Sequence, residues 1–471
     1  MKRAMKRATK RATWIVISIA GTAVGMASAA AQSAPAGTGK GLDLPPIRQL
    51  GAVSATVQEK LGVVSGIRPL SDGRVLVNEP QSRRVLLFDA TLQNFTIVAD
   101  TTPATNNAYG GRIAGLVAYR GDSTLFVDPQ SLSMLVLDPA GKVARVMSVP
   151  NAQDAMAFAG PLGTGGVDPQ GRLVYRASPR FDFRGGAPGA AGGPPRIPEI
   201  PDSALILRID LATRKLDTLG YIRTPKVKMN TTQDENGRIM MTSEINPLPV
   251  VDEWAMTSDG SVAFVRGRDY HIDWVGPDGT RTSSAKIPFE WQRLSDEDKV
   301  AFIDSVKAAR ERMGTNAPMA MTPGGGQQVV AGGPPGGGGG EQRVMIFSGG
   351  GPGGDGAGRG RGAPGQGGPG GMPMTPPQMK FVDPSELPDY KPVFLTGFVR
   401  ADTEGNVWIR TIPTKAIAGG PVYDVVNRKG ELVERVQIPV GRTITAFGPG
   451  GVVYLTSRDG QVTKLEKASV R

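Results

Sequence analysis

The sequence contains few of the residues that common catalytic sites require. His271 is the single histidine, and there is no cysteine. These counts exclude metal sites built from several histidines, thiol nucleophiles, and nucleophilic machinery that needs a second histidine. His271 alternates with Tyr270, Ile272 and Trp274, which favours a structural place on a strand. The absence of cysteine also excludes a disulfide framework.

Arginines and aromatic residues provide the main candidates for ligand binding. Arg176, Arg266 and Arg410 each end an apolar run, and guanidinium groups suit a peptide carboxylate or an acidic sugar. Aromatic residues close to arginines are typical of protein or glycan recognition. The six candidate ligand-binding residues are Arg176, Arg266, Arg410, Trp254, Trp291 and Tyr390.

The elements that must position these residues repeat along the chain. Six times a short apolar run ends in a turn that contains glycine, and a second apolar run follows. Where nothing is inserted, the turns are about 45–50 residues apart, a period that suits four short strands per unit, as in a propeller blade. The turns contain Asp72-Gly73, Gly121-Asp122, Gln170-Gly171, Asp259-Gly260, Glu404-Gly405 and Pro449-Gly450.

The predicted fold is all-β: a six-bladed β-propeller with four-stranded antiparallel blades. Val75, Val77, Val85 and Leu87 show the period of two that marks strands with a buried face. The last repeat has only three runs before the sequence ends. We expect residues 47–58 to provide its fourth strand, because pairing with the C-terminal strand closes the ring without an open edge.

Two segments carry a resemblance to known families. The run Asn78-Glu79-Pro80-Gln81-Ser82-Arg83-Arg84-Val85 resembles an NHL-type repeat, and residues 126–138 resemble it more weakly. Residues 47–471, apart from the insertions, are similar to exported six-bladed propellers of the NHL and TolB-like kind. The segment from Trp254 to Gly260, with Tyr270-His271-Ile272-Asp273-Trp274, also resembles a bacterial six-bladed group of unassigned function. These motifs consist of strands and turns, so they imply a fold and no activity.

The resemblance leaves one enzymatic alternative, because some six-bladed propellers are calcium-dependent lactonases or esterases. Calcium requires roughly six to eight oxygen ligands, and Glu253 with Asp252 and, more remotely, Glu244 are the candidates at the channel. The equivalent positions on other inner strands are small residues, such as Gly66 and Gly397. One carboxylate among small residues is a poor calcium site, so the sequence predicts no cofactor, with calcium as the alternative.

Three insertions interrupt the repeats at residues 181–201, 224–251 and 290–392. All three are expected on one face of the propeller, where repeat proteins commonly bind ligands. Ser295 and Asp298 predict a capping box for a helix, which we expect to cover that face. Residues 315–379 are rich in glycine and proline and are expected to be disordered.

The first residues read as a signal peptide that ends at residue 31. A basic segment precedes the apolar run 14–25, and small residues follow it. Residues 32–45 are expected to be a flexible N-terminal segment. Six of the excess positive charges behind the net charge of +11 lie in the first eleven residues, so the remainder carries no nucleic-acid footprint. We expect an exported, periplasmic or extracellular protein with no membrane span after cleavage, and a monomer.

Together these features predict a non-catalytic binding or scaffold propeller, and an enzyme is the less favoured reading. Its ligand would be a protein, a peptide or a glycan on the face that carries the insertions. The alternative is a calcium-dependent lactonase or esterase that uses Glu253 at the central channel.

Overall fold

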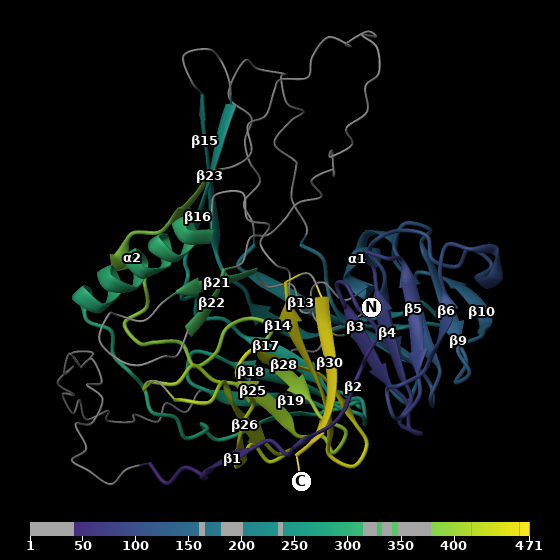
Figure 1. Cartoon of the computed structure of the whole chain (residues 1–471). Coiled ribbons are helices and arrows are strands. Elements are labelled where there is room, and N and C mark those ends of the chain that lie inside the picture. The colour runs from purple at the N-terminus through teal and green to yellow at the C-terminus, as the bar shows by residue number, and fades with distance from the viewer. Residues whose placement is uncertain are drawn as a thin grey trace, which may run out of the picture. The chain divides into compact units, whose positions relative to one another are not determined.

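The computed structural model describes residues 42–159, 165–179, 201–233, 239–313, 327–331, 342–346, 378–415, 417–460 and 462–470. Leu42–Arg471 forms one compact unit. In the described ranges the chain is almost entirely β, and the α-helices are α1 (Ala155–Phe158) and α2 (Asp296–Met313) (Figure 1). No helix in these ranges has the length and apolar character needed to cross a bilayer. The predicted signal peptide and most of the predicted flexible segment lie outside the described residues.

Six sheets repeat one pattern, in which consecutive strands pair antiparallel. The first contains β3 (Gly66–Pro69), β4 (Val75–Glu79), β5 (Arg84–Phe88) and β6 (Phe95–Ala99), and the second β7 (Gly115–Ala118), β8 (Thr124–Asp128), β9 (Ser133–Leu137) and β10 (Val143–Ser148). The third contains β11 (Gly166–Val167), β12 (Arg172–Arg176), β13 (Ser203–Asp210) and β14 (Leu216–Arg223), and the fourth β17 (Glu253–Met256), β18 (Val262–Arg266), β19 (His271–Val275) and β20 (Arg281–Ser283). The fifth contains β24 (Val399–Ala401), β25 (Val407–Arg410), β26 (Val422–Val426) and β27 (Leu432–Gln437), and the sixth β28 (Arg442–Gly448), β29 (Val452–Asp459) and β30 (Val462–Ser469).

The predicted glycine turns join the first and second strands of these sheets. In the first sheet, Asp72 accepts a hydrogen bond from the backbone N–H of Arg74 at 3.0 Å, and Gly73 has φ +87°. In the fifth, Asp402 accepts from the N–H of Asn406 at 2.8 Å, and Gly405 also has φ +87°. An aspartate that bonds its own turn and a glycine at positive φ are the residues such turns require.

Each sheet packs its two faces against two neighbouring sheets, and this packing makes the molecule a β-propeller. Leu76 of the first sheet shares a core with Phe126 of the second. At the other end of the chain, Tyr454 of the sixth sheet shares a core with Phe88 of the first. The first and last sheets are therefore in contact, as a closed ring requires.

The N-terminal strand closes the last sheet as predicted. β2 (Val53–Thr56) pairs antiparallel with β30, so the expected pairing with the C-terminal strand is confirmed. The preceding residues were expected in the same strand but form β1 (Ile47–Gln49), which pairs parallel with β27 of the fifth sheet. Gly51 lies at the change of sheet, where a Cβ atom would lie 2.6 Å from the carbonyl oxygen of Ser469.

Parts of two insertions form a small additional unit. β15 (Val227–Gln233), β16 (Ile239–Ile245) and β23 (Gln378–Phe381) form a three-stranded sheet. The capping box of α2 is present, because Ser295 and Asp298 exchange hydrogen bonds of 2.9 and 3.2 Å. Ile303 and Val306 of α2 are buried against this unit (Figure 1). The helix therefore covers the small sheet, and the expectation that it covers the propeller face is wrong.

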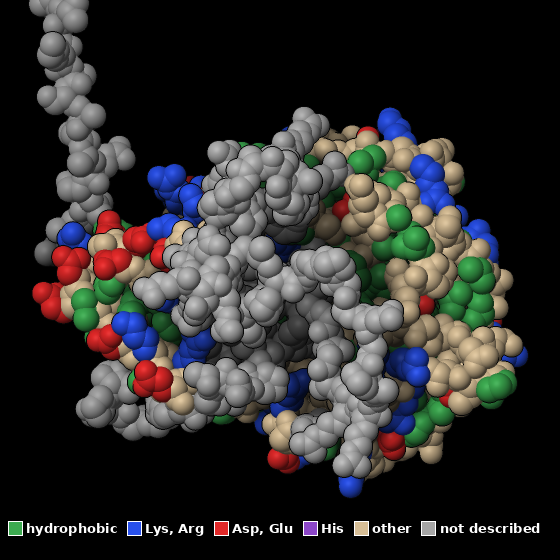
Figure 2. Space-filling model, turned by 90° about the horizontal axis from the view of Figure 1, so that it is seen from above, with side chains coloured by type: hydrophobic (Ala, Val, Ile, Leu, Met, Phe, Trp, Pro, Cys, Tyr) green, Lys and Arg blue, Asp and Glu red, His purple; other side chains and the backbone are tan. Residues whose placement is uncertain are grey.

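The outer surface of α2 is charged. Figure 2 shows Asp and Glu side chains gathered at the edge of the molecule where α2 lies, and the first turn of the helix contains Asp296, Glu297 and Asp298. Of residues 315–379, predicted to be disordered, the structure describes β21 (Gln327–Ala331), β22 (Gln342–Ile346) and the first two residues of β23. The rest of that prediction lies outside the described residues.

Ring closure by the N-terminal segment can be tested with two valines. Val57 is 6% exposed, lies in the core between the sixth and first sheets and donates its N–H to the carbonyl of Leu465 at 2.9 Å. Val57→Ala should lower the free energy of unfolding by about 2 kcal/mol, because it removes buried methyl groups and leaves a cavity. Val53→Ala, at a residue that is 38% exposed, should change it by less than about 0.5 kcal/mol. Chemical denaturation measures both, and equal effects would contradict this account.

Candidate functional site

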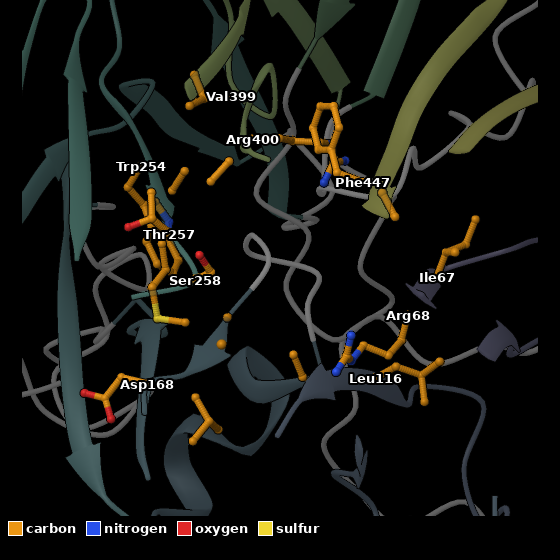
Figure 3. Close-up of a pocket in the computed structure, with 18 of the residues that line it drawn as sticks. Ile67, Arg68, Leu116, Asp168, Trp254, Thr257, Ser258, Val399, Arg400 and Phe447 are labelled. Carbon is orange, nitrogen blue, oxygen red and sulfur yellow. The ribbon is translucent and has the colours of Figure 1, made fainter. Parts of the chain in front are cut away.

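A cavity of 760 Å³ lies where the first strands of the sheets meet. Residues of β3, β7, β11, β17, β24 and β28 line it, so every sheet contributes. Figure 3 shows Arg68, Trp254 and Arg400 around this space, on strands of three different sheets. Its charged lining residues include one glutamate and several arginines.

Glu253 is a buried carboxyl group of this cavity, and its surroundings shift its pKa. It begins β17 and is 7% exposed. The backbone N–H of Gly397 donates a hydrogen bond to its Oε1 at 3.0 Å. Burial raises the pKa of Glu253 to about 7, although the Gly397 bond and the charges of Arg176 and Arg400 act in the opposite direction. A carboxyl group with this pKa exchanges its proton near neutral pH.

Three arginines on strands of three sheets share the cavity with Glu253, and Arg120 in a turn also lines it. Arg68 lies in β3, Arg176 ends β12 and Arg400 lies in β24. Burial lowers the pKa of each guanidinium, and the charge of Glu253 partly compensates this effect at Arg176 and Arg400. A low-dielectric, cationic surface of this kind stabilises negative charge in a ligand or a reaction intermediate.

Several buried polar atoms of the lining have no hydrogen-bond partner in the described part of the chain. They are the Nε atoms of Arg68 and Arg176 and the Oγ1 of Thr396. Buried polar groups in folded proteins are nearly always hydrogen-bonded, and exceptions require an explanation. Their common location in one cavity indicates a place for a polar ligand or ordered water.

Arg68 and Glu253 lie on opposite sides of this cavity. β3 contacts β7 and β28, and β7 contacts β11. Met256 of β17 lies beside Gly166 of β11, and β17 contacts β24. β17 is therefore three strands away from β3 in either direction around the cavity. A ligand that reached both residues would have to cross it.

Asp252, the predicted metal partner of Glu253, lies outside the cavity lining. Its carboxylate accepts hydrogen bonds from the N–H groups of Arg223 and Gly267 at 3.1 and 3.2 Å, and Arg266 pairs with it at 3.0 Å. Because successive side chains along extended backbone point to opposite sides, Asp252 and Glu253 do not form a pair of ligands. Glu244 lies in β16 of the small additional sheet and does not line the cavity.

The predicted ligand-binding residues are divided between separate places. Arg176 and Trp254 line the cavity. Arg266 pairs with Asp252 and Asp273, and the guanidinium of Arg410 lies 4.4 Å from the ring centroid of Phe398. Trp291 and Tyr390, 39% and 41% exposed, pack edge to face with ring centroids 6.4 Å apart. These four residues do not line the cavity.

Sequence reasoning missed Arg68 and Arg400 as site residues. The inner strands were compared at a single position each, which drew attention to Gly66 and Gly397. Arg68 lies two residues after Gly66, and Arg400 three residues after Gly397. The signal that could have found them is an arginine inside a short strand expected to border the central channel.

No family model matches this sequence, and no curated protein matches it. Solved structures similar to the chain include regucalcin from Agrobacterium tumefaciens, named as a calcium-binding protein, with 10% identity, a TM-score of 0.37, and coverage of 90% of this chain and 98% of that one. A gluconolactonase from Xanthomonas campestris has 11% identity, a TM-score of 0.35, and coverage of 90% and 96%. Virginiamycin B lyase from Staphylococcus aureus has 10% identity, a TM-score of 0.32, and coverage of 88% and 98%.

The prediction of no cofactor is not supported by this comparison, in which one structure is named as a calcium-binding protein. The prediction of a non-catalytic protein finds no support there either. The packing of the sheets carries the β-propeller, and these structures do not support the narrower NHL or TolB-like assignment.

The lining residues themselves decide whether calcium fits this cavity. Among the residues that the structure describes, no group of three or more His, Cys, Asp or Glu side chains could hold a metal ion. The second carboxylate of the lining, Asp168, pairs with Arg172 at 2.7 Å. Glu253 is accompanied by arginines, whose charge repels a cation. The described lining therefore does not fit calcium, which requires several converging oxygens.

The raised pKa of Glu253 predicts a pH dependence of stability. The folded protein holds this proton up to about pH 7, whereas the unfolded chain releases it near the ordinary value of 4.5. The contribution of Glu253 to the free energy of unfolding is therefore complete below pH 4.5. It falls by about 3 kcal/mol in total as the pH rises to about 7. The glutamine side chain in Glu253→Gln cannot ionise, so the variant should lack this loss. The difference in free energy of unfolding between wild type and variant should therefore change between pH 4.5 and about 7.

Denaturant unfolding of wild type and variant at a series of pH values measures that difference. Glu404→Gln is the matched control, because Glu404 is exposed and outside the cavity lining. It should follow the wild type at every pH. A constant difference between wild type and Glu253→Gln would show that Glu253 titrates normally.

Proposed function

We propose that the protein is a hydrolase that cleaves a small ester or lactone in the arginine-lined cavity, with Glu253 as the proton-transfer group. The observation that carries the proposal is a buried carboxyl with a pKa of about 7 beside Arg176 and Arg400. The cavity volume of 760 Å³ lies within the range of small-molecule sites, about 300–1,000 Å³. The lining also includes Trp254, Ala255 and Phe447, which offer apolar contact to a substrate.

The reaction can be assigned to residues of this chain. In its carboxylate form Glu253 accepts a proton from a water molecule, and the resulting hydroxide attacks the carbonyl carbon. Arg176 and Arg400 stabilise the negative charge that develops on the carbonyl oxygen. The carbon–oxygen bond of the ester then breaks, and protonated Glu253 returns its proton to the leaving alkoxide. An ester gives a carboxylic acid and an alcohol, a lactone gives a single hydroxy acid, and no step is assigned to a cation.

The number of blades, the export of the protein and its oligomeric state are proposed from the sequence. We propose that the six repeated sheets are six blades, and that the basic and apolar residues 1–31 direct export to the periplasm or the medium. A monomer is part of the proposal. A protein, peptide or glycan partner is a second proposal for the surface, favoured by the exposed pair Trp291 and Tyr390.

A hydrolysis assay on aryl esters and aliphatic lactones tests the enzymatic proposal. Glu253→Gln should lower kcat at least about 100-fold, as loss of general acid–base catalysis does, and Glu404→Gln should not change it. The rate of the wild type should depend on a group with a pKa of about 7. Thermal unfolding of each variant verifies that it is folded.

Calcium is included as a separate arm of this assay. Activity without added calcium and in the presence of a chelator agrees with proton transfer by Glu253. Activity that requires calcium would replace that role with metal binding. A wild-type protein that hydrolyses no member of the panel, with or without calcium, would contradict the proposal.

A further inference from the structure

We propose that Arg68 forms a second subsite in the cavity, which binds a carboxylate group of the substrate at a distance from the bond that is cleaved. This inference rests on the proposed hydrolysis for its reaction, but the binding it describes can be measured without turnover. It narrows the substrate to an ester or lactone that also carries an acid group.

The surroundings of Arg68 leave its charge without a bonded carboxylate in the described part of the chain. Its guanidinium donates to the backbone carbonyl of Pro69 and, at 3.3 Å, to that of Gly121. The Nε is buried and has no hydrogen-bond partner among the described residues. Two carbonyls orient the group but do not neutralise it, so its position is fixed while its charge is available to a ligand.

The acid that acts on Arg68 from a distance is already engaged. Asp122 provides that attraction, and its carboxylate accepts hydrogen bonds from the N–H of Ser71, at 3.0 Å, and from the Ser71 hydroxyl. These bonds fix Asp122 in the contact between two turns. It therefore supports the charge of Arg68 while its own oxygens are held by Ser71.

The position of Arg68 separates this subsite from the reaction centre. β3 is three strands away from β17, which carries Glu253, in both directions around the cavity. Figure 3 shows Arg68 on a different side of the space from Arg400 and Trp254. Ile67 and Leu116 add apolar lining near Arg68 (Figure 3). A ligand with charge at one end and a reacting carbonyl at the other fits this arrangement.

The chemistry of the guanidinium determines which group it binds. Its planar N–H groups match the two oxygens of a carboxylate, and such charged hydrogen bonds are about twice as strong as neutral ones. A neutral hydroxyl or amide of a substrate would leave the buried charge uncompensated. The subsite therefore selects for an acid in preference to a neutral group of the same size.

Isothermal titration calorimetry with simple acids tests the subsite directly. The probes are glutarate, adipate and pimelate, which carry two carboxylates, and butyrate, which carries one. The wild type should bind the best dicarboxylate about 10- to 100-fold more tightly than butyrate, as expected for added charged hydrogen bonds. Arg68→Met, which keeps the length of the side chain and removes its charge, should abolish this preference.

Two variants complete the experiment. Arg74→Met is the matched control, because Arg74 lies in the turn after β3 and pairs with Asp72 outside the cavity lining, so it should keep the preference. Arg68→Lys keeps the charge and should retain part of the preference, which preserves the test if the methionine variant does not fold. Equal binding of dicarboxylates and butyrate by the wild type, or an unchanged preference in Arg68→Met, would overturn the proposal.

The same titrations separate this proposal from the proposed hydrolysis. Glu253→Gln should lose hydrolysis but keep the preference for dicarboxylates that depends on Arg68. A wild type that shows this preference and hydrolyses nothing would support the subsite and refute the reaction. Hydrolysis of neutral esters with no effect of Arg68→Met on the binding of any probe would support the reaction and refute the subsite.

Discussion

Burial of both faces of each sheet is the constraint on which the rest of the structure depends. The strands are too short to form an independent core, and apolar residues of each sheet are covered by the next, as Val174 of the third sheet is by Phe264 of the fourth. This packing brings the first strands close together. Gly166 of β11 shows how closely, because a side chain there would overlap Met256 of β17. The cavity is a consequence of this approach, and its lining is assembled from residues far apart in the sequence.

The cavity shows how burial and charge compete at one site. Two guanidinium groups favour the ionised form of Glu253, yet desolvation is the larger effect and raises its pKa to about 7. Arg176 and Arg400 are destabilised by the same burial. Each group therefore reduces the free-energy cost of burying the other. A buried group whose desolvation is only partly offset by its neighbours can still change its protonation state when a substrate binds.

The sequence predicted the local structure and the closure of the ring, because both depend on short patterns. Turns such as Asp72-Gly73 need particular residues, and a sixth repeat that lacks a strand must find one. The partner of helix α2 was not predictable, since an apolar stripe shows that a helix is covered but not by which element. The small sheet joins β16 to β23, strands from two different insertions. Arg68 and Arg400 were missed because the lining depends on register along each inner strand, which the turns do not determine to a single residue.

The charges of the cavity also affect the end of the proposed reaction. Hydrolysis of an ester produces a new carboxylate beside Arg176, Arg400 and Glu253. While Glu253 is protonated, the two guanidinium groups hold this product. Once Glu253 loses its proton, two carboxylates compete for the same pair of arginines in a medium of low dielectric constant, which is unfavourable. The proton state of one buried glutamate therefore influences both the attack of water and the release of the acid, and Arg68 retains only the part of the substrate that does not react.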